Sequence, residues 1–117
     1  MTEADRAIQI RLAGSGLPSA GRLEMFYNGR WGTVCYGYSR YSHSTTNTVC
    51  RQLGYSSAVR FGFLNRSTNV SSWLNFRDIQ CSGRESSIIY CKGLNWRLHH
   101  CVQQQNLGIT CKDGMYW

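Results

Sequence analysis

Six cysteines constrain this chain of 117 residues more than any other feature. Their number is even and no two lie within four residues of each other, so the C-x-x-C pairs of structural zinc sites and thioredoxin-like redox centres are absent. Widely spaced cysteines in a short chain predict disulfides, which persist in oxidising compartments. We therefore predict a disulfide-bonded extracellular protein in which each bridge contributes about 2 to 4 kcal/mol. The cysteines are Cys35, Cys50, Cys81, Cys91, Cys101 and Cys111.

The length allows one domain with a real hydrophobic core. The first 14 residues contain no apolar run of signal-peptide length, and nothing downstream approaches the roughly 20 apolar residues of a membrane span. We therefore expect residues 1–7 to be a cloning remnant or linker, 8–112 to fold, and 113–117 to form a tail. The domain is expected to come from a longer secreted or membrane-anchored protein, without inserting into the membrane itself.

The chain is basic, with 13 lysines and arginines against 6 acidic residues and a formal net charge of +7. Only Lys92 and Lys112 are lysines, so nearly all of the positive charge is guanidinium. Arginine pairs bidentately with carboxylate, sulfate or phosphate and stacks on aromatic rings. This bias favours a polyanion-binding surface, although a soluble secreted domain with a merely positive surface would look the same.

The hydrophobic pattern predicts an α+β fold. Alternation over 8–12 indicates a strand, and strands over 21–27 and 31–35 should form a hairpin around Asn28-Gly29. Apolar spacing of three and four residues then predicts a helix of about ten residues, with Ser44 or Thr45 as N-cap and Gly54 as its end. Later elements are expected to be strands over 77–81 and 107–111 and one or two helical turns over 85–91.

The span from 55 to 75 is polar and rich in serine and asparagine, which predicts an exposed loop. It contains two glycosylation sequons, at Asn65 and Asn69. In a secreted glycoprotein either could carry a glycan.

Several ordered motifs support a resemblance to a known family. They are G-R-L-E-M at 21–25, G-R-W-G-T-V-C at 29–35, V-C-R-Q-L-G-Y at 49–55, D-I-Q-C-S-G-R-E at 78–85, Cys91 and L-G-I-T-C at 107–111. The chain resembles, over 8–111, a scavenger receptor cysteine-rich domain with the six-cysteine spacing of group A.

The resemblance implies a compact curved antiparallel sheet of about six strands that cradles one helix. It implies a non-catalytic ligand-binding module of receptors, secreted proteins of innate immunity or multidomain proteases. It also implies the bridges Cys35–Cys101, Cys50–Cys111 and Cys81–Cys91, whereas spacing alone leaves fifteen pairings open.

Calcium-binding members of this family carry acidic pairs after the first cysteine and before the last. Here Tyr36 and Gly37 occupy the first pair, and Gln105 replaces a carboxylate before Cys111. A hard cation needs six or more oxygens, several of them charged. We therefore expect no metal at the family site and no cofactor.

Arginine and tyrosine gather where the acidic positions are lost. Arg77 stands at a usually acidic position, which makes it the leading candidate for direct anion contact, with Arg40 second. The alternative is that Arg77 only pairs with Asp78 or Glu85. The tyrosines near Arg40, in the segment 36–47, could form a protein-binding or glycan-stacking surface, or they could cover the helix. These tyrosines are Tyr36, Tyr38 and Tyr41.

An enzyme is not expected, because G-x-S-x-G, P-loop and H-E-x-x-H patterns are absent and carboxylates are few. Glu85 is expected to cap a helix. The adjacent His99 and His100 lack nearby carboxylates, which disfavours zinc. Basic and aromatic residues also occur in single-strand nucleic-acid binders, but the cysteines and the lack of a fold signature argue against sequence-specific binding.

Two classes of function remain open. One is a module whose own surface recognises an extracellular protein or a polyanionic glycan. The other is an accessory domain that positions a neighbouring enzyme, such as a serine protease, in a longer secreted protein. The sequence gives no indication of oligomeric state.

Overall fold

The computed structural model describes residues 9–27, 29–35, 43–65, 72–75, 79–93 and 105–112. Strands and one α-helix in these ranges confirm the predicted α+β class. Their order is β1 (Gln9–Gly14), β2 (Ala20–Tyr27), β3 (Arg30–Cys35), α2 (His43–Gln52), β4 (Ala58–Asn65), β5 (Ser72–Asn75), the 3-10 turn η2 (Ile88–Tyr90) and β6 (Gln105–Cys111).

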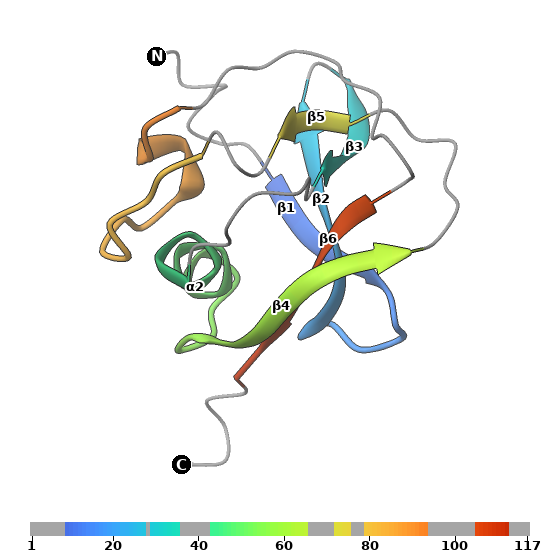
Figure 1. Cartoon of the computed structure of the whole chain (residues 1–117), viewed down its shortest axis with the longest axis horizontal. Helices are drawn as coiled ribbons and strands as arrows, with labels where there is room; N and C mark the ends of the chain where they lie inside the picture. Colours follow the sequence, from blue (N-terminus) through green and yellow to red (C-terminus); the bar gives the residue numbers. More distant parts are fainter. Residues whose placement is uncertain are drawn as a thin grey trace.

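The strands form one curved sheet in the order β1-β2-β3-β6-β4, with β5 on β3 and a further pairing of β2 with β6 (Figure 1). The sheet is antiparallel, as expected, apart from one parallel pair among the described strands, β3 with β5. A parallel pair requires a long crossover. The chain makes this crossover by passing through α2 and β4 between the two strands.

The predicted hairpin of β2 and β3 is confirmed. Phe26 pairs with Trp31 and Tyr27 with Arg30, so the two strands are joined by a tight turn that includes Gly29. Gly29 has φ +83°, the left-handed conformation that two-residue hairpin turns require. The rings of Phe26 and Trp31 lie 5.3 Å apart and fix the register of the hairpin.

Alternation along β2 separates two faces of the sheet. Leu23 and Met25 are fully buried and pair with Leu12 and Ile10 of β1. They form the core with Val49 of α2, which lies against this inner face. The side chains that alternate with them on β2 point to the opposite side, which we call the outer face.

The helix α2 begins at His43, so the predicted caps Ser44 and Thr45 lie inside its first turn. Thr45 and Thr48 are fully buried, and Thr48 Oγ1 donates to the Ser44 carbonyl at 3.1 Å. Thr45 Oγ1 donates outside the helix, to the Ile79 carbonyl at 3.4 Å, so both hydroxyls are satisfied in a face that would otherwise be apolar. The predicted end at Gly54 is confirmed: Gly54 N–H donates to Arg51 and Tyr55 N–H to Cys50 in a Schellman motif.

The exposed loop predicted over 55–75 is wrong, because this span contains β4 and β5. Strand β4 pairs with β6 from Ala58 to Asn65. Its apolar residues Val59, Phe61, Phe63 and Leu64 favour a strand, and the polar flanks hid this signal. The sequon residue Asn65 ends β4, whereas Asn69 lies outside the described residues.

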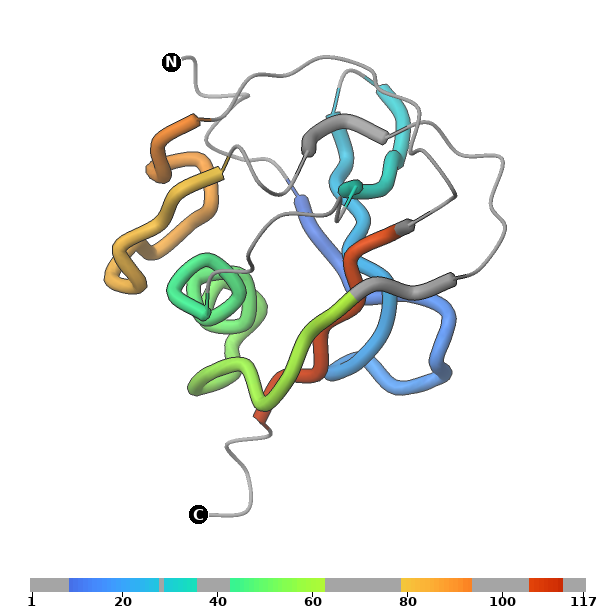
Figure 2. Tube along the Cα trace, in the orientation of Figure 1, coloured from blue at the N-terminus to red at the C-terminus, as the bar shows by residue number. Residues whose placement is uncertain are grey.

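The strand predicted over 77–81 also needs correction. Within its described part, Gln80 forms only an isolated bridge with Lys92. The helical turn expected within 85–91 is confirmed as η2. Figure 2 shows the segment 79–93 beside α2, although the two are distant in sequence. Hydrogen bonds join them, including Gln52 Oε1 accepting from Ile88 N–H at 2.9 Å.

Disulfides tie these parts together. Cys50–Cys111 joins α2 to β6, and Cys81–Cys91 closes the segment 79–93. Cys35 is also disulfide-bonded, and its expected partner Cys101 lies outside the described residues. None of the helices in the described ranges is long and apolar enough to cross a membrane.

Candidate functional site

The ligand-binding residues predicted from the sequence lie outside the described residues. Asp78, the neighbour of the leading candidate Arg77, lies outside them too. They remain predictions. They are Arg77, Arg40, Tyr36, Tyr38 and Tyr41.

A second arginine cluster lies on the outer face of the sheet. Glu24 of β2 is its centre, with only 6% of its side chain exposed. Arg11 Nε donates to Glu24 Oε1 at 2.7 Å, and Arg22 Nε donates to Glu24 Oε2 at 2.9 Å. Arg11 is the cross-strand neighbour of Glu24, and Arg22 lies two residues before it. One carboxylate thus serves two guanidinium groups, and the cluster keeps a net positive charge.

Arg11 also stacks on an aromatic ring. Its guanidinium carbon lies 3.9 Å from the centroid of Trp31 on β3. This cation–π contact and the ion pair with Glu24 hold Arg11 from two sides. The hairpin therefore supplies both partners that fix the outermost arginine of the cluster.

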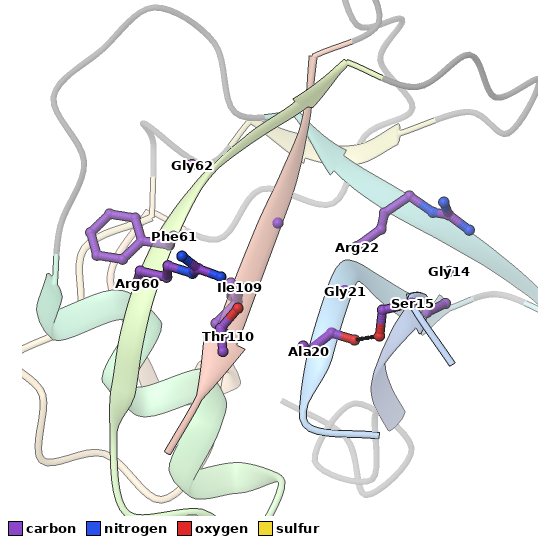
Figure 3. Close-up of a pocket in the computed structure, with 12 residues that line it drawn as sticks. Gly14, Ser15, Ala20, Gly21, Arg22, Arg60, Phe61, Gly62, Ile109 and Thr110 are labelled. Carbon is purple, nitrogen blue, oxygen red and sulfur yellow. Dashed lines mark hydrogen bonds between the residues drawn. The ribbon is translucent and has the colours of Figure 1, made fainter. Parts of the chain in front are cut away.

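A pocket of about 380 Å³ opens beside this cluster, between the turn after β1 and strands β4 and β6 (Figure 3). Two cross-strand rows explain the hollow. The first runs Arg22–Gly108–Gly62 and the second Ala20–Thr110–Arg60. Each row has an arginine at one end and small side chains elsewhere, so the arginines occupy opposite corners.

The turn that forms one wall is tightly hydrogen-bonded. Ser15 Oγ accepts from Leu17 N–H at 3.0 Å and donates to the Ala20 carbonyl (Figure 3). Gly21 has φ +143°, and a Cβ there would lie 2.4 Å from the Ala13 carbonyl oxygen. Only glycine allows this close approach of β1 and β2. The wall is therefore set by backbone geometry.

Arg60 lies at the opposite corner of the pocket. Arg60 is exposed, and its guanidinium forms no hydrogen bond or ion pair within the described part of the chain. Sequence reasoning missed Arg60 because it assigned this span to a loop. The alternation A-V-R-F-G-F could have revealed it, since it places Arg60 and Gly62 on the face opposite Phe61.

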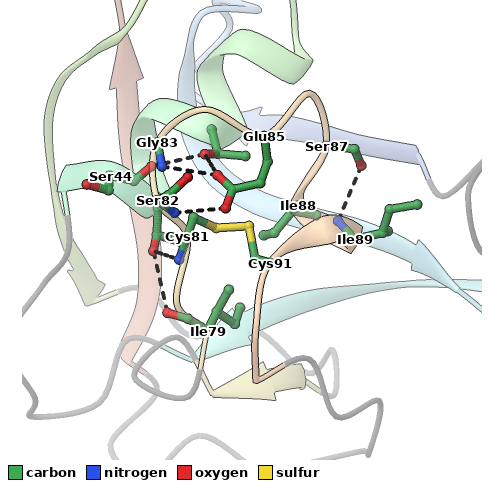
Figure 4. Close-up of a disulfide and its surroundings, with 12 residues drawn as sticks. Ser44, Ile79, Cys81, Ser82, Gly83, Glu85, Ser87, Ile88, Ile89 and Cys91 are labelled. Carbon is green, nitrogen blue, oxygen red and sulfur yellow. Dashed lines mark hydrogen bonds between the residues drawn. A yellow bond between two sulfur atoms is a disulfide. The ribbon is translucent and has the colours of Figure 1, made fainter.

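A different carboxylate arrangement lies in the segment 79–93 (Figure 4). Glu85 accepts from the N–H groups of Ser82, Gly83 and Arg84 at 2.8, 3.0 and 3.1 Å. Chiefly the Ser82 hydrogen bond lowers the pKa of Glu85 to about 2. The predicted helix-capping role of Glu85 is wrong, because Ser87 caps η2. Glu85 instead organises the loop before that turn.

This segment offers no metal site in its described residues. Cys81, Glu85 and Cys91 have ligand atoms within 4.8 Å of one another. The two cysteines form a disulfide, so neither sulfur is a thiolate. The carboxylate of Glu85 is already occupied by backbone donors.

Comparisons with known proteins agree with this architecture. A family model for the scavenger receptor cysteine-rich domain matches residues 13–112. The chain is 36% identical over 104 residues to macrophage receptor MARCO of Mesocricetus auratus and 33% over 113 to lysyl oxidase homolog 3B of Danio rerio. It is 32% identical over 114 residues to galectin-3-binding protein of Rattus norvegicus. These matches cover 89%, 94% and 96% of the chain but only 20%, 14% and 19% of the relatives.

Solved structures show the same fold. The dimeric form of the cysteine-rich domain of mouse MARCO superimposes with a TM-score of 0.66 at 29% identity, covering 96% of this chain and all of that one. The third such domain of murine neurotrypsin gives a TM-score of 0.64 at 26% identity, covering 90% and 96%.

Proposed function

The chain belongs to the scavenger receptor cysteine-rich family, and from this premise we propose that it is an extracellular module that binds anionic ligands through arginine, without calcium. Domains of this family are typically non-catalytic receptor modules. The relatives include a macrophage receptor and a galectin-3-binding protein, which supports recognition of extracellular proteins or glycans. Which ligand this chain takes depends on its own surface.

The observation that supports anion binding most directly is the charge of the outer face. Arg11 and Arg22 there share the single carboxylate of Glu24, and Arg60 adds a further positive charge at the far corner of the pocket. Guanidinium groups can meet sulfate, phosphate or carboxylate directly. No bridging cation is required in such a contact.

The test is binding of the isolated domain to heparin, lipopolysaccharide and dextran sulfate across a salt series, with and without chelator. Binding should fall with added salt and should not change with chelator. Calcium-dependent binding would contradict the proposal.

Charge reversal then locates the surface. Arg77→Glu tests the position favoured by the sequence, with Arg40 second, and Arg60→Glu tests the outer face. Arg84→Glu is the matched control, because Arg84 is exposed in the segment 79–93 and only its main-chain N–H, not its guanidinium, makes hydrogen bonds within the described residues. The true contact surface should lose heparin affinity several-fold more than Arg84→Glu. Equal losses would mean that only net charge matters.

An accessory role is a second candidate. The chain spans a fifth or less of the curated relatives it matches, and one of these is a lysyl oxidase homolog. In that case the domain would position a neighbouring catalytic domain. Full-length protein lacking the domain would then keep intrinsic catalysis on a small substrate but lose activity on its macromolecular target.

A further inference from the structure

We infer that the pocket between Arg22 and Arg60 is a subsite for one sugar unit that carries a sulfate or carboxylate group. The inference rests on the proposed function and narrows it. A face that attracts polyanions needs only positive charge, whereas a pocket selects the shape of one unit.

The two arginines are not equivalent. Arg22 Nε and Nη2 are both 2.9 Å from Glu24 Oε2, so this guanidinium is held in place and partly neutralised. Arg60 is exposed, with a guanidinium free of partners in the described ranges, and extends from β4 toward β6 (Figure 3). The anionic group should therefore contact Arg60. Arg22 forms part of the opposite wall, where its side chain runs toward Gly14 and Nη1 lies 3.2 Å from the place that a Cβ at Gly14 would take (Figure 3).

The size of the pocket limits its occupant. Its volume of about 380 Å³ is near the lower end of small-ligand pockets, which are roughly 300 to 1,000 Å³. This is enough for one sugar-sized unit. A polymer could place a single unit in the pocket, with its neighbours lying over the charged outer face.

The chemistry of the walls favours a sugar over a peptide. The floor of the pocket is β6, which pairs with β2 on one side and with β4, the last strand of the sheet, on the other, so a peptide strand cannot be added at the floor itself. The outer-facing wall residues Ala20, Gly62 and Gly108 are small, which leaves no deep apolar slot for a peptide anchor. Thr110 lines the same hollow, and its hydroxyl has no hydrogen-bond partner in the described residues. Guanidinium groups with a free hydroxyl suit an anion on a hydroxyl-rich ring.

Gly62→Val is the sharpest test, because it fills the pocket without changing charge. A Cβ at Gly62 would meet nothing within 4 Å, and valine favours strands, so the variant should fold. Gln9→Val is the matched control, since it adds valine at an exposed strand position outside the pocket. Equal melting temperatures in the three proteins would confirm that folding is intact.

The probe is N-acetylglucosamine 6-sulfate, with unsulfated N-acetylglucosamine as the neutral comparison, followed by amide NMR shifts. The wild type and Gln9→Val should show saturable shifts at Gly62, Gly108 and Thr110 with the sulfated sugar. Gly62→Val and Arg60→Gln should weaken this binding at least tenfold, and the neutral sugar should produce no saturable shifts.

Heparin binding separates this inference from the proposed function. Gly62→Val should keep most heparin affinity, because the arginines of the outer face are unchanged. Absence of saturable sugar shifts, or the same shifts in Gly62→Val, would overturn the subsite while heparin binding still supported the module. If the wild type did not bind heparin, both the subsite and the proposed anion-binding function would be overturned.

Discussion

Glu24 and Glu85 are the carboxylates of the described residues, and they are stabilised in opposite ways. On the outer face, Glu24 is paired with the guanidinium groups of Arg11 and Arg22. In the segment 79–93, Glu85 is surrounded by backbone N–H groups. The first arrangement leaves excess positive charge at the surface, whereas the second uses one negative charge to order a loop. The difference separates a surface suited to ligands from a segment that serves the fold.

The largest expected effect that tests this difference between the outer face and the segment 79–93 is the loss of stability on removing a disulfide. Cys50–Cys111 spans 61 residues and Cys81–Cys91 spans 10. Loop entropy predicts that replacing the first pair by alanine costs about 4 kcal/mol and the second about 3 kcal/mol. Urea unfolding of the two double variants measures both costs. A greater loss at Cys81–Cys91 would show that the segment 79–93 supports the whole domain and not only itself.

Reduction of every bridge extends that test. It should abolish cooperative unfolding, because a domain of this size gains much of its stability from covalent links. Thiol counting under denaturing conditions is the control. Six reactive thiols in secreted protein would contradict the oxidised state.

A smaller effect should distinguish Glu85 by its pH dependence. Its pKa is lowered from 4.5 to about 2 in the folded protein, so its contribution is complete above pH 4.5 and is lost as pH falls toward 2. Glu85→Gln should cost about 2 kcal/mol at neutral pH. The gap between variant and wild type should close between pH 4.5 and 2.

Chemical denaturation at pH 7, 4 and 2.5 measures this gap. Glu85→Asp is a useful companion, because it keeps the charge but shortens the reach to Ser82 N–H. A gap that stays constant with pH would mean that the amide donors do not stabilise the charged form.

The smallest expected effect is that of calcium. Both described carboxylates already have partners, and the family positions carry Tyr36, Gly37 and Gln105. Calorimetry should show no binding below millimolar calcium, and chelator should not shift melting. A saturable heat of tight calcium binding would point to Asp78 or unforeseen carbonyl oxygens as ligands. It would also contradict the assignment of Glu24 and Glu85 to arginine and backbone partners alone.

Local signals predicted the parts of the fold that depend on neighbours in sequence. Asn28-Gly29 specified the hairpin, and Gly54 specified the end of α2. Strand β4 was missed because its apolar residues lie between polar flanks. The expected Glu85 cap failed because the carboxylate turns back to amides at 82–84.

The pocket could not be read from sequence for a related reason. It exists because Gly62 and Gly108 are cross-strand neighbours, and only the register of β4 with β6 brings them together. The positive charge of the chain predicted anion binding in general. It could not choose between Arg77, which stands at a position that is usually acidic in the family, and Arg60, which the sheet places at the pocket.

The end of β6 has a mechanical consequence. Cys111 is bonded to Cys50, its N–H donates to the Ser19 carbonyl, and Lys112 N–H donates to the Ser57 carbonyl. Tension applied at residue 112 therefore passes through a covalent link into α2 before it can peel β6 from β4. The domain should therefore resist force applied at residue 112. After reduction of Cys50–Cys111, the same force would separate β6 from β4 one hydrogen bond at a time.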